Sequence, residues 1–467
     1  MSKSSKNHVV RTAGLLERYH VTRVALGLDT CVLVSARYVS TADSSSKLTP
    51  SILYPALRKL IETEGALCVR IEYSPSPFRK PKFIRLPTIN LDKAVEFKAT
   101  SGSLQEELEH QTSYGFDFRS TEKPLWRLTV LPDNTVIFAY HHAIGDGMSG
   151  RAFHISLLQA LQTMPLSDTK ETDALVEVPI QINMTPPVEK CTKVTLSVKS
   201  LLGVLSGSRP SGDTPWTALP VTASIPTTKR FRNYVRLISI TPSEATSLLA
   251  LSKQHKSTLT GTLFALSVHS LSQVLAQGAN PKYNSVLVSI PMSLRPLTGI
   301  PENRMCDQAS AHTILAHLPP PSTPLPNDAF WAEATKASDT LRTQRQNSLK
   351  IIANLRFAPL VGGFTGYFKS QLGKPRGSGL SLVNVGAWPR SPSPQDSLKP
   401  NWEVAEAAFT QEDTVTGDPV KICVMGGGDG SLTIAVNWGE SSAESALMEA
   451  FIGKLEENAR CLAALKA

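Results

Sequence analysis

Residues 141–147 read His-His-Ala-Ile-Gly-Asp-Gly, and this stretch decides how the rest of the chain is interpreted. It follows an apolar run at 135–140 that predicts a strand and precedes a predicted helix over about 148–162. Adjacent side chains of a strand point to opposite faces, so His141 and His142 should not enter the same cavity. One imidazole then suits a general base and the other a supporting role. This arrangement disfavours a shared metal site, and we predict none.

The same residues also admit plain structural interpretations. A His-His pair at a strand end is often only two polar side chains whose hydrogen bonds are satisfied, and Asp-Gly often marks a turn. Asp146 could hold the loop by pairing with a distant arginine, or it could cap the following helix. Gly147 would allow the backbone to turn sharply. From the residues alone, both interpretations of Asp146 stay open.

Apolar periodicity on either side of the motif predicts alternating helices and strands. Predicted strands lie at 24–38, 66–73, 125–130, 234–240, 285–291, 380–387, 420–425 and 432–437. Predicted helices lie at 50–64, 241–255, 259–277, 328–348 and 443–465, and Thr241-Pro242-Ser243-Glu244 is a capping-box start. The pattern indicates an α/β (α+β) protein with strands in both halves.

A proline-rich stretch separates these halves. Between 165 and 228 the chain carries eight prolines and many Ser and Thr, which is typical of a long irregular connection. We expect one short helix in it, near 194–205. The predicted organisation is an N-terminal subdomain at 1–180, a crossover at 181–224 and a C-terminal subdomain at 225–467. Each half should pack a mixed sheet with helices, with the ligand site between them.

Composition excludes several classes of protein. The 467 residues are 41% hydrophobic and 19% charged, which argues against a disordered chain, and no apolar run reaches membrane-spanning length. The net charge of +9 comes from 48 basic and 39 acidic residues without an aromatic-interleaved basic stripe, so we expect no nucleic-acid partner. The N-terminus lacks the apolar core of a signal peptide. These features predict a cytoplasmic monomer, with peripheral association with a membrane or lipid surface left open.

The stretch at 141–147 resembles the HHxxxDG motif of the chloramphenicol acetyltransferase-like acyltransferases in residue type, spacing and position after a strand. This superfamily includes plant BAHD acyltransferases, peptide-synthetase condensation domains and fungal alcohol acetyltransferases, and the last branch is the nearest likeness. Leu16-Glu17-Arg18-Tyr19 and Ser289-Ile290-Pro291-Met292-Ser293-Leu294-Arg295 also resemble it. The chain lacks the DFGWG segment of BAHD enzymes. Ser381-Leu382-Val383-Asn384 only partly resembles the Ser-Asn-x-Gly strand of relatives.

The resemblance implies a two-domain fold and a role for each residue of the motif. His142 would be the general base, His141 and Gly147 would be structural, and Asp146 would pair with an arginine, for which Arg295 is the candidate. Ser381 and Asn384 are weaker candidates for contacts to the oxyanion or substrate.

Two glycine-rich loops remain. Residues 425–430 (Met-Gly-Gly-Gly-Asp-Gly) precede a predicted strand instead of a helix, so a hairpin turn fits better than a phosphate loop. Residues 373–379 carry Lys374 and Arg376. They form a flexible loop or contact the phosphates of coenzyme A.

Two classes of function follow from the resemblance. The first is an O-acyltransferase of secondary metabolism that moves an acyl group, most simply acetyl, from acetyl-CoA or another acyl-CoA to a small-molecule alcohol. It would need no bound cofactor, although a carrier-bound donor stays open. The second is a non-transferase relative that uses the same chamber for cyclisation, epimerisation or ligand binding.

Overall fold

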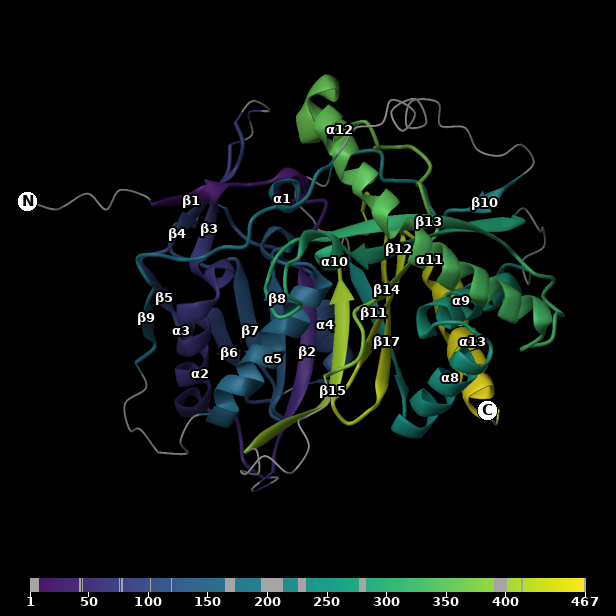
Figure 1. The fold of residues 1–467 in the computed structure, drawn as a ribbon, viewed down its shortest axis with the longest axis horizontal. Helices are drawn as coiled ribbons and strands as arrows, with labels where there is room; N and C mark the ends of the chain where they lie inside the picture. The colour runs from purple at the N-terminus through teal and green to yellow at the C-terminus, as the bar shows by residue number, and fades with distance from the viewer. Residues whose placement is uncertain are drawn as a thin grey trace, which may run out of the picture.

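The computed structural model describes the chain from residue 8 to residue 465, apart from 42, 44, 75, 77–78, 101, 119, 164–172, 195–212, 226–231, 277–282, 390–400 and 413–414. The short helix expected near 194–205 lies almost wholly outside the described residues. The first half of the chain, purple to blue, occupies the left of Figure 1, and the second half, teal to yellow, lies mainly on the right. No helix in the described part is both long and apolar enough to cross a membrane.

The sheet of the first half has five strands. They are β2 (Val32–Ser40), β6 (Val95–Phe97), β7 (Trp126–Val130), β8 (Thr135–Tyr140) and β15 (Trp402–Gln411), in the order β15-β2-β8-β7-β6. The predicted hairpin at 125–140 is confirmed, with Asn134 at positive φ in its turn. Strand β15 comes from the second half of the sequence and pairs antiparallel with β2, as the yellow-green and purple strands of Figure 1 show.

Helices and small sheets complete the first half. The helices are α1 (Leu15–Ala25), α2 (Pro50–Thr63), η1 (Gly65–Cys68), α3 (Leu91–Ala94), α4 (Leu104–Thr112), η2 (His142–Ile144), α5 (Gly147–Thr163) and α6 (Val188–Cys191). A three-stranded sheet contains β1 (Val9–Thr12), β4 (Lys82–Arg85) and β3 (Val69–Glu72), and a two-stranded one contains β5 (Thr88–Asn90) and β9 (Leu175–Glu177). Helix α5 packs on β2 and β15 and against α2.

The second half is built on a seven-stranded sheet. Its strands are β10 (Pro215–Trp216), β11 (Asn233–Ile240), β12 (Ser285–Ser293), β13 (Ala309–His317), β14 (Leu380–Asn384), β16 (Val420–Gly426) and β17 (Leu432–Gly439). The order is β10-β12-β14-β16-β17-β11, with β13 also paired to β12. The pairs β12–β14 and β14–β16 are parallel, and β16–β17 is the antiparallel hairpin that residues 425–430 predict.

Helices of the second half are α8 (Pro242–Gln254), α9 (Leu259–Leu275), α10 (Arg295–Thr298), α11 (Asp328–Asn354), η3 (Leu355–Val361), α12 (Gly363–Lys369) and α13 (Ser445–Ala463). Helix α9 packs against α11, α13 and α8, and its side chains are buried along almost its whole length. The capping box that starts α8 is confirmed, because Thr241 Oγ1 accepts from the Glu244 N–H and the Glu244 carboxylate accepts from the Thr241 N–H.

Two predicted strands are wrong in part. In the run 66–73, the residues up to Cys68 belong to η1, and only β3 is extended. The run 24–38 was expected to be extended throughout, but helix α1 continues to Ala25 and β2 begins only at Val32. Gly27 sits between them at φ +71°, a left-handed conformation that ends a helix at little steric cost for glycine. Two apolar segments that read as one strand are therefore a helix end and a strand separated by a turn.

Candidate active site

A cavity of about 320 Å³ lies where the two halves meet. Its lining comes from α1 (Tyr19, His20, Arg23), the loop after β8 (His142, Asp146, Gly147), β12, Asp307, β14 (Ser381, Val383, Asn384) and β15 (Phe409, Gln411). Sequence-distant elements thus converge on the end of β8. This position agrees with the expectation of a ligand site between the halves.

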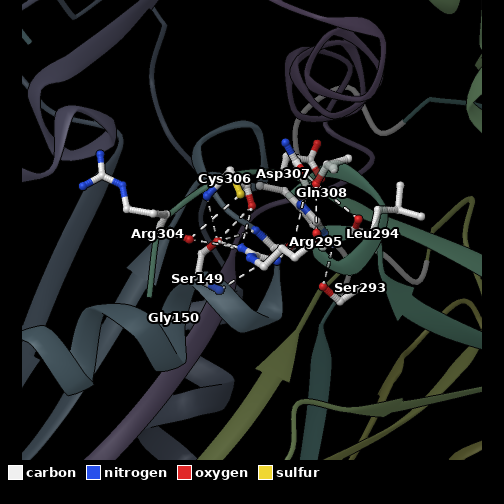
Figure 2. A network of polar contacts seen from close by, with 12 residues as sticks. Ser149, Gly150, Ser293, Leu294, Arg295, Arg304, Cys306, Asp307 and Gln308 are labelled. Atoms are coloured by element: carbon white, nitrogen blue, oxygen red, sulfur yellow. Dashed lines mark hydrogen bonds and ion pairs between the residues drawn. The ribbon is translucent and has the colours of Figure 1, made fainter. Parts of the chain in front are cut away.

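The loop 141–147 is held by a buried ion pair between Asp146 and Arg295. Arg295 Nη1 donates to Asp146 Oδ2 at 2.7 Å and Nη2 donates to Oδ1 at 3.1 Å, so the pair is bidentate. The Gln308 backbone N–H donates to Oδ2 at 3.1 Å and the Ser149 N–H donates to Oδ1 at 3.1 Å. Figure 2 shows Arg295 at the centre of this network, facing Ser149 and the Arg304 and Cys306 carbonyls. The arginine that the resemblance implied for Asp146 is therefore present.

The charges in this pair reinforce one another. Burial alone would raise the pKa of Asp146, but the Arg295 guanidinium and the hydrogen bonds from Gln308 and Ser149 lower it below its usual value. Burial opposes the charge on Arg295, and Asp146 outweighs this effect and raises the arginine pKa. Since the Ser149 N–H also bonds Asp146, the carboxylate caps α5 as well. Both interpretations that the sequence left open are realised together.

The two histidines face different ways, as strand alternation predicts. His141 is fully buried, its Nδ1 accepts from the Ala143 N–H at 2.9 Å, and its ring lies near Phe118. His142 lines the cavity with 14% of its side chain exposed. Burial, together with the neighbouring His20, lowers the pKa of His142 to about 3, so its imidazole is neutral at physiological pH.

His20 and Asp307 are site residues that the sequence reasoning missed. The His20 ring stacks on the His142 ring at 3.7 Å between centroids and an interplanar angle of 6°. Asp307 Oδ1 lies 3.9 Å from His142 Nδ1, and its Oδ2 lies 3.6 Å from His20 Nε2. Burial first, and then the charge of Asp146, raise the pKa of Asp307 well above its usual value. Nothing local in the sequence around 20 or 307 indicates this arrangement.

One group of described residues could be considered as ligands of a metal ion. The ligand atoms of His20, His142 and Asp307 lie within 4.8 Å of one another. Imidazole nitrogens coordinate in the plane of the ring. With the two rings stacked in parallel, one ion between them would lie well out of both planes. The geometry suits proton handling between imidazoles and a carboxyl better than metal coordination.

Gly147 matters for packing more than for backbone freedom. Its φ lies outside the left-handed region, so the sharp turn expected from the sequence is not the reason for glycine here. A Cβ at this position would lie 2.8 Å from Val385 Cγ1 and 3.0 Å from Phe409 Cζ. Any side chain would therefore push the first turn of α5 away from β15 and the chain after β14.

The two weaker candidates on β14 both line the cavity. Asn384 Nδ2 donates to Thr260 Oγ1 at 3.0 Å, and its Oδ1 accepts from the Gly386 N–H at 2.9 Å, which fixes the amide. Ser381 is buried, and its hydroxyl is one of three that lower the pKa of Asp418 against the effect of burial. Asn384 is thus the better placed of the two to offer a donor to a ligand.

The phosphate contact predicted for Arg376 does not fit its surroundings. Its side chain is buried, Nε donates to the Leu219 carbonyl at 2.7 Å, and Nη1 donates to the Gly417 carbonyl at 2.9 Å. The guanidinium ties three backbone segments together, which a phosphate contact would disrupt. Lys374 is exposed, but it does not line the cavity that contains His142.

A second, more basic cavity of about 670 Å³ adjoins the first. The two share the lining residues Met148, Pro291, Met292, Ser293, Asn384 and Val385. The second cavity also contains Arg151, Lys256, Arg342 and Arg345, against the acids Glu302 and Asp339. Arg151 pairs with Glu302 and Arg342 with Asp339, whereas Lys256 and Arg345 have no ion-pair partner among the described residues.

Comparison with known proteins shows the family. The sequence profile of the alcohol acetyltransferase family matches residues 12–458. A probable alcohol acetyltransferase, crmB of Aspergillus fumigatus, is 24% identical over 468 residues, covering 93% of this chain and 96% of that protein. A probable alcohol acetyltransferase of Fusarium pseudograminearum, FCK4, is 22% identical and covers 81% of this chain and 80% of that protein.

Solved structures share the fold at low identity. The trichothecene 15-O-acetyltransferase TRI3 of Fusarium sporotrichioides superposes with a TM-score of 0.67 at 14% identity, covering 97% of this chain and 94% of that one. The condensation domain of the monacolin K polyketide synthase MokA gives 0.60 at 13% identity, covering 99% of both chains. The fold is the two-domain, chloramphenicol acetyltransferase-like one, and the chain belongs to the alcohol acetyltransferase family.

Proposed function

We propose that the protein is an O-acyltransferase that moves an acyl group, most simply acetyl, from acyl-CoA to the hydroxyl of a small-molecule alcohol, with His142 as general base. The observation that carries this proposal is the position of His142. Its imidazole lines the cavity between the two halves, on a loop that the buried Asp146–Arg295 pair holds. The supporting interactions fix the loop backbone and leave the His142 ring facing the space a substrate would occupy.

The protonation state supports base catalysis. A pKa of about 3 leaves His142 neutral and able to accept the hydroxyl proton as the alcohol oxygen attacks the thioester carbonyl. Negative charge that develops on the tetrahedral oxyanion favours the imidazolium, because an opposite charge nearby raises the proton affinity of the ring. Collapse of the intermediate breaks the carbon–sulfur bond. The imidazolium returns the proton to the departing thiolate, which leaves ester and free thiol.

Asn384 is the oxyanion donor that we favour. One amide hydrogen serves Thr260, and an amide nitrogen carries two, so a second N–H is left for a ligand. Preorganised donors of this kind stabilise charge that appears only in the transition state. Asp307 is the proposed positioning residue for the ring, since its Oδ1 lies 3.9 Å from His142 Nδ1.

The second cavity is the proposed site for the donor. Coenzyme A carries several phosphate charges, and Lys256 and Arg345 supply cations that no described acid pairs with. The shared lining residues would let a thioester reach Asn384 and His142 from this side. This assignment replaces Arg376 as a phosphate contact.

The test is thiol release from acetyl-CoA in the presence of a panel of alcohols, with ester products identified by mass spectrometry. Release that depends on an alcohol supports the transferase, and His142→Ala should lower turnover by about 10²- to 10⁴-fold while the protein stays folded. His141→Ala should reduce stability more than turnover, because His141 packs in the core. Ligand binding without any release of thiol would favour the non-transferase alternative instead.

A further inference from the structure

The end of α11, helix η3 and helix α12 form a lobe, residues 345–369, in which exposed apolar side chains are concentrated. Leu360 is 78% exposed, Val361 52%, Ile351 45% and Tyr367 37%. These are four of the nine large hydrophobic side chains that are exposed in the described part of the chain, and they fall within 17 residues of sequence. In Figure 1, α12 lies at the upper edge of the molecule, above β13 and α10. Clustered exposure of this kind marks an interaction surface.

The lobe is also cationic. Residues 345–369 contain four Lys and Arg (Arg345, Lys350, Arg356 and Lys369) and no Asp or Glu. Lys350, Arg356 and Lys369 are exposed on the lobe itself. A neighbouring cavity of about 260 Å³ brings Arg356 together with Arg18, Arg79 and Lys80. Exposed apolar side chains and exposed cations on one lobe complement an anionic surface that has an apolar interior.

We propose that this lobe docks the protein onto the surface of an anionic phospholipid bilayer. Leu360 and Val361 would enter the boundary between headgroups and acyl chains, and the surrounding Lys and Arg would face the phosphates and carboxylates of the lipids. Together the exposed apolar and basic side chains of the lobe provide the two signals that stable association with a bilayer requires.

Docking at this lobe would place the entrance of the active-site cavity at the membrane. Ile351 and Tyr367 are exposed and also line the cavity that contains His142, so they form its rim. An alcohol that partitions into lipid could then enter without crossing water. This consequence rests on the proposed function, because it assumes that the cavity takes an alcohol, whereas the docking itself does not.

The experiment is flotation of the full-length protein with vesicles of phosphatidylcholine alone or with about 30% phosphatidylserine. We expect binding only to the vesicles that contain phosphatidylserine, and weaker binding as salt rises from about 0.05 to 0.5 M. Leu360→Asp with Val361→Asp should reduce the bound fraction by about tenfold or more. The matched control is Leu175→Asp with Ile180→Asp, which adds the same two charges at residues that are 48% and 79% exposed but outside the lobe. It should bind as the unmodified protein does.

Equal binding to both kinds of vesicle, or equal binding by the lobe variant and the control, would overturn the proposal. So would selective loss of binding to an acidic carrier protein in the lobe variant without any change in flotation. Activity on a water-soluble alcohol separates the two proposals. Leu360 and Val361 line neither proposed substrate cavity, so the variant should keep this activity, and its absence in the unmodified protein would count against the proposed function alone.

Discussion

The stacked rings of His20 and His142 give the first prediction at the scale of single residues. His20 is one of the causes that lower the pKa of His142, after burial. His20→Phe keeps a flat ring against His142 but removes that contribution, so the pKa of His142 should rise. A base works in its unprotonated form, so the acid limb of kcat/KM should move to higher pH in the variant. The control His110→Phe changes an exposed histidine away from the cavity, and an identical shift there would refute the coupling.

The ion pair of the motif loop gives a second prediction at this scale. Asp146→Asn removes the carboxylate and leaves the Arg295 charge buried, which costs about 3–5 kcal/mol of unfolding free energy when a buried pair is broken. Turnover should fall as well, because the loop that carries His142 loses its anchor. Denaturant unfolding measures the first effect and initial rates the second.

The matched comparison is Glu302→Gln, which breaks an ion pair to Arg151 whose carboxylate is mostly exposed. That change should cost no more than about 1 kcal/mol. If Asp146→Asn proved equally mild, Asp146 would be only a helix cap, since asparagine caps almost as well as aspartate.

At the scale of elements, the contact between α5 and β2 contains a buried histidine that forms hydrogen bonds to β2. His154 Nδ1 lies 2.9 Å from the Tyr38 hydroxyl and Nε2 lies 3.0 Å from the Val34 carbonyl oxygen. Burial lowers its pKa to about 4, whereas an unfolded histidine titrates near 6.5. The folded state thus binds fewer protons than the unfolded state between these values, and this contribution to stability is lost as pH falls from about 6.5 toward 4.

The third prediction uses that difference. His154→Gln should destabilise the protein at pH 7, and the gap between the two proteins should shrink by about 2 kcal/mol on going to pH 5, because only the unmodified chain has this proton to bind on unfolding. Chemical unfolding at the two pH values measures the gap. A gap that stays constant with pH would show that His154 titrates normally in the folded protein.

Strand β15 shows why part of the fold could not be predicted. Its sequence, Trp-Glu-Val-Ala-Glu-Ala-Ala-Phe-Thr-Gln, is rich in Ala and Glu, which favour helices, and its burial follows no simple alternation because it has a register shift after Val404. Pairing with β2 and contact with β16 and β17 impose the extended form. By contrast, local signals in the sequence, which are apolar periodicity and capping residues, predict helices α2, α5, α8 and α9.

At the scale of the whole molecule, the candidate site also has one part that the sequence predicts and another that only the fold brings together. The motif at 141–147 names His142 and Asp146 because its chemistry is contiguous in sequence. His20 and Asp307 come from 122 residues before and 165 residues after His142, and only the packing of α1 and the chain before β13 against η2 brings them together. Arg376 illustrates the reverse error, since a basic glycine loop suggests phosphate binding while the fold buries this cation.

The last prediction concerns capture of the donor by the charge of the second cavity. Acyl-CoA is polyanionic, so attraction toward Lys256 and Arg345 should speed its binding, and this attraction is screened beyond about 8 Å at physiological salt. The association rate measured by stopped flow should therefore fall as salt rises, while the rate of the chemical step stays constant. Lys256→Gln with Arg345→Gln should slow association roughly tenfold at low salt and flatten its salt dependence.

Lys82→Gln with Lys454→Gln removes the same charge away from both cavities and should leave most of the salt dependence intact. Equal slopes for the two double variants would mean that the donor enters elsewhere, and Lys374 would then be the next cation to substitute.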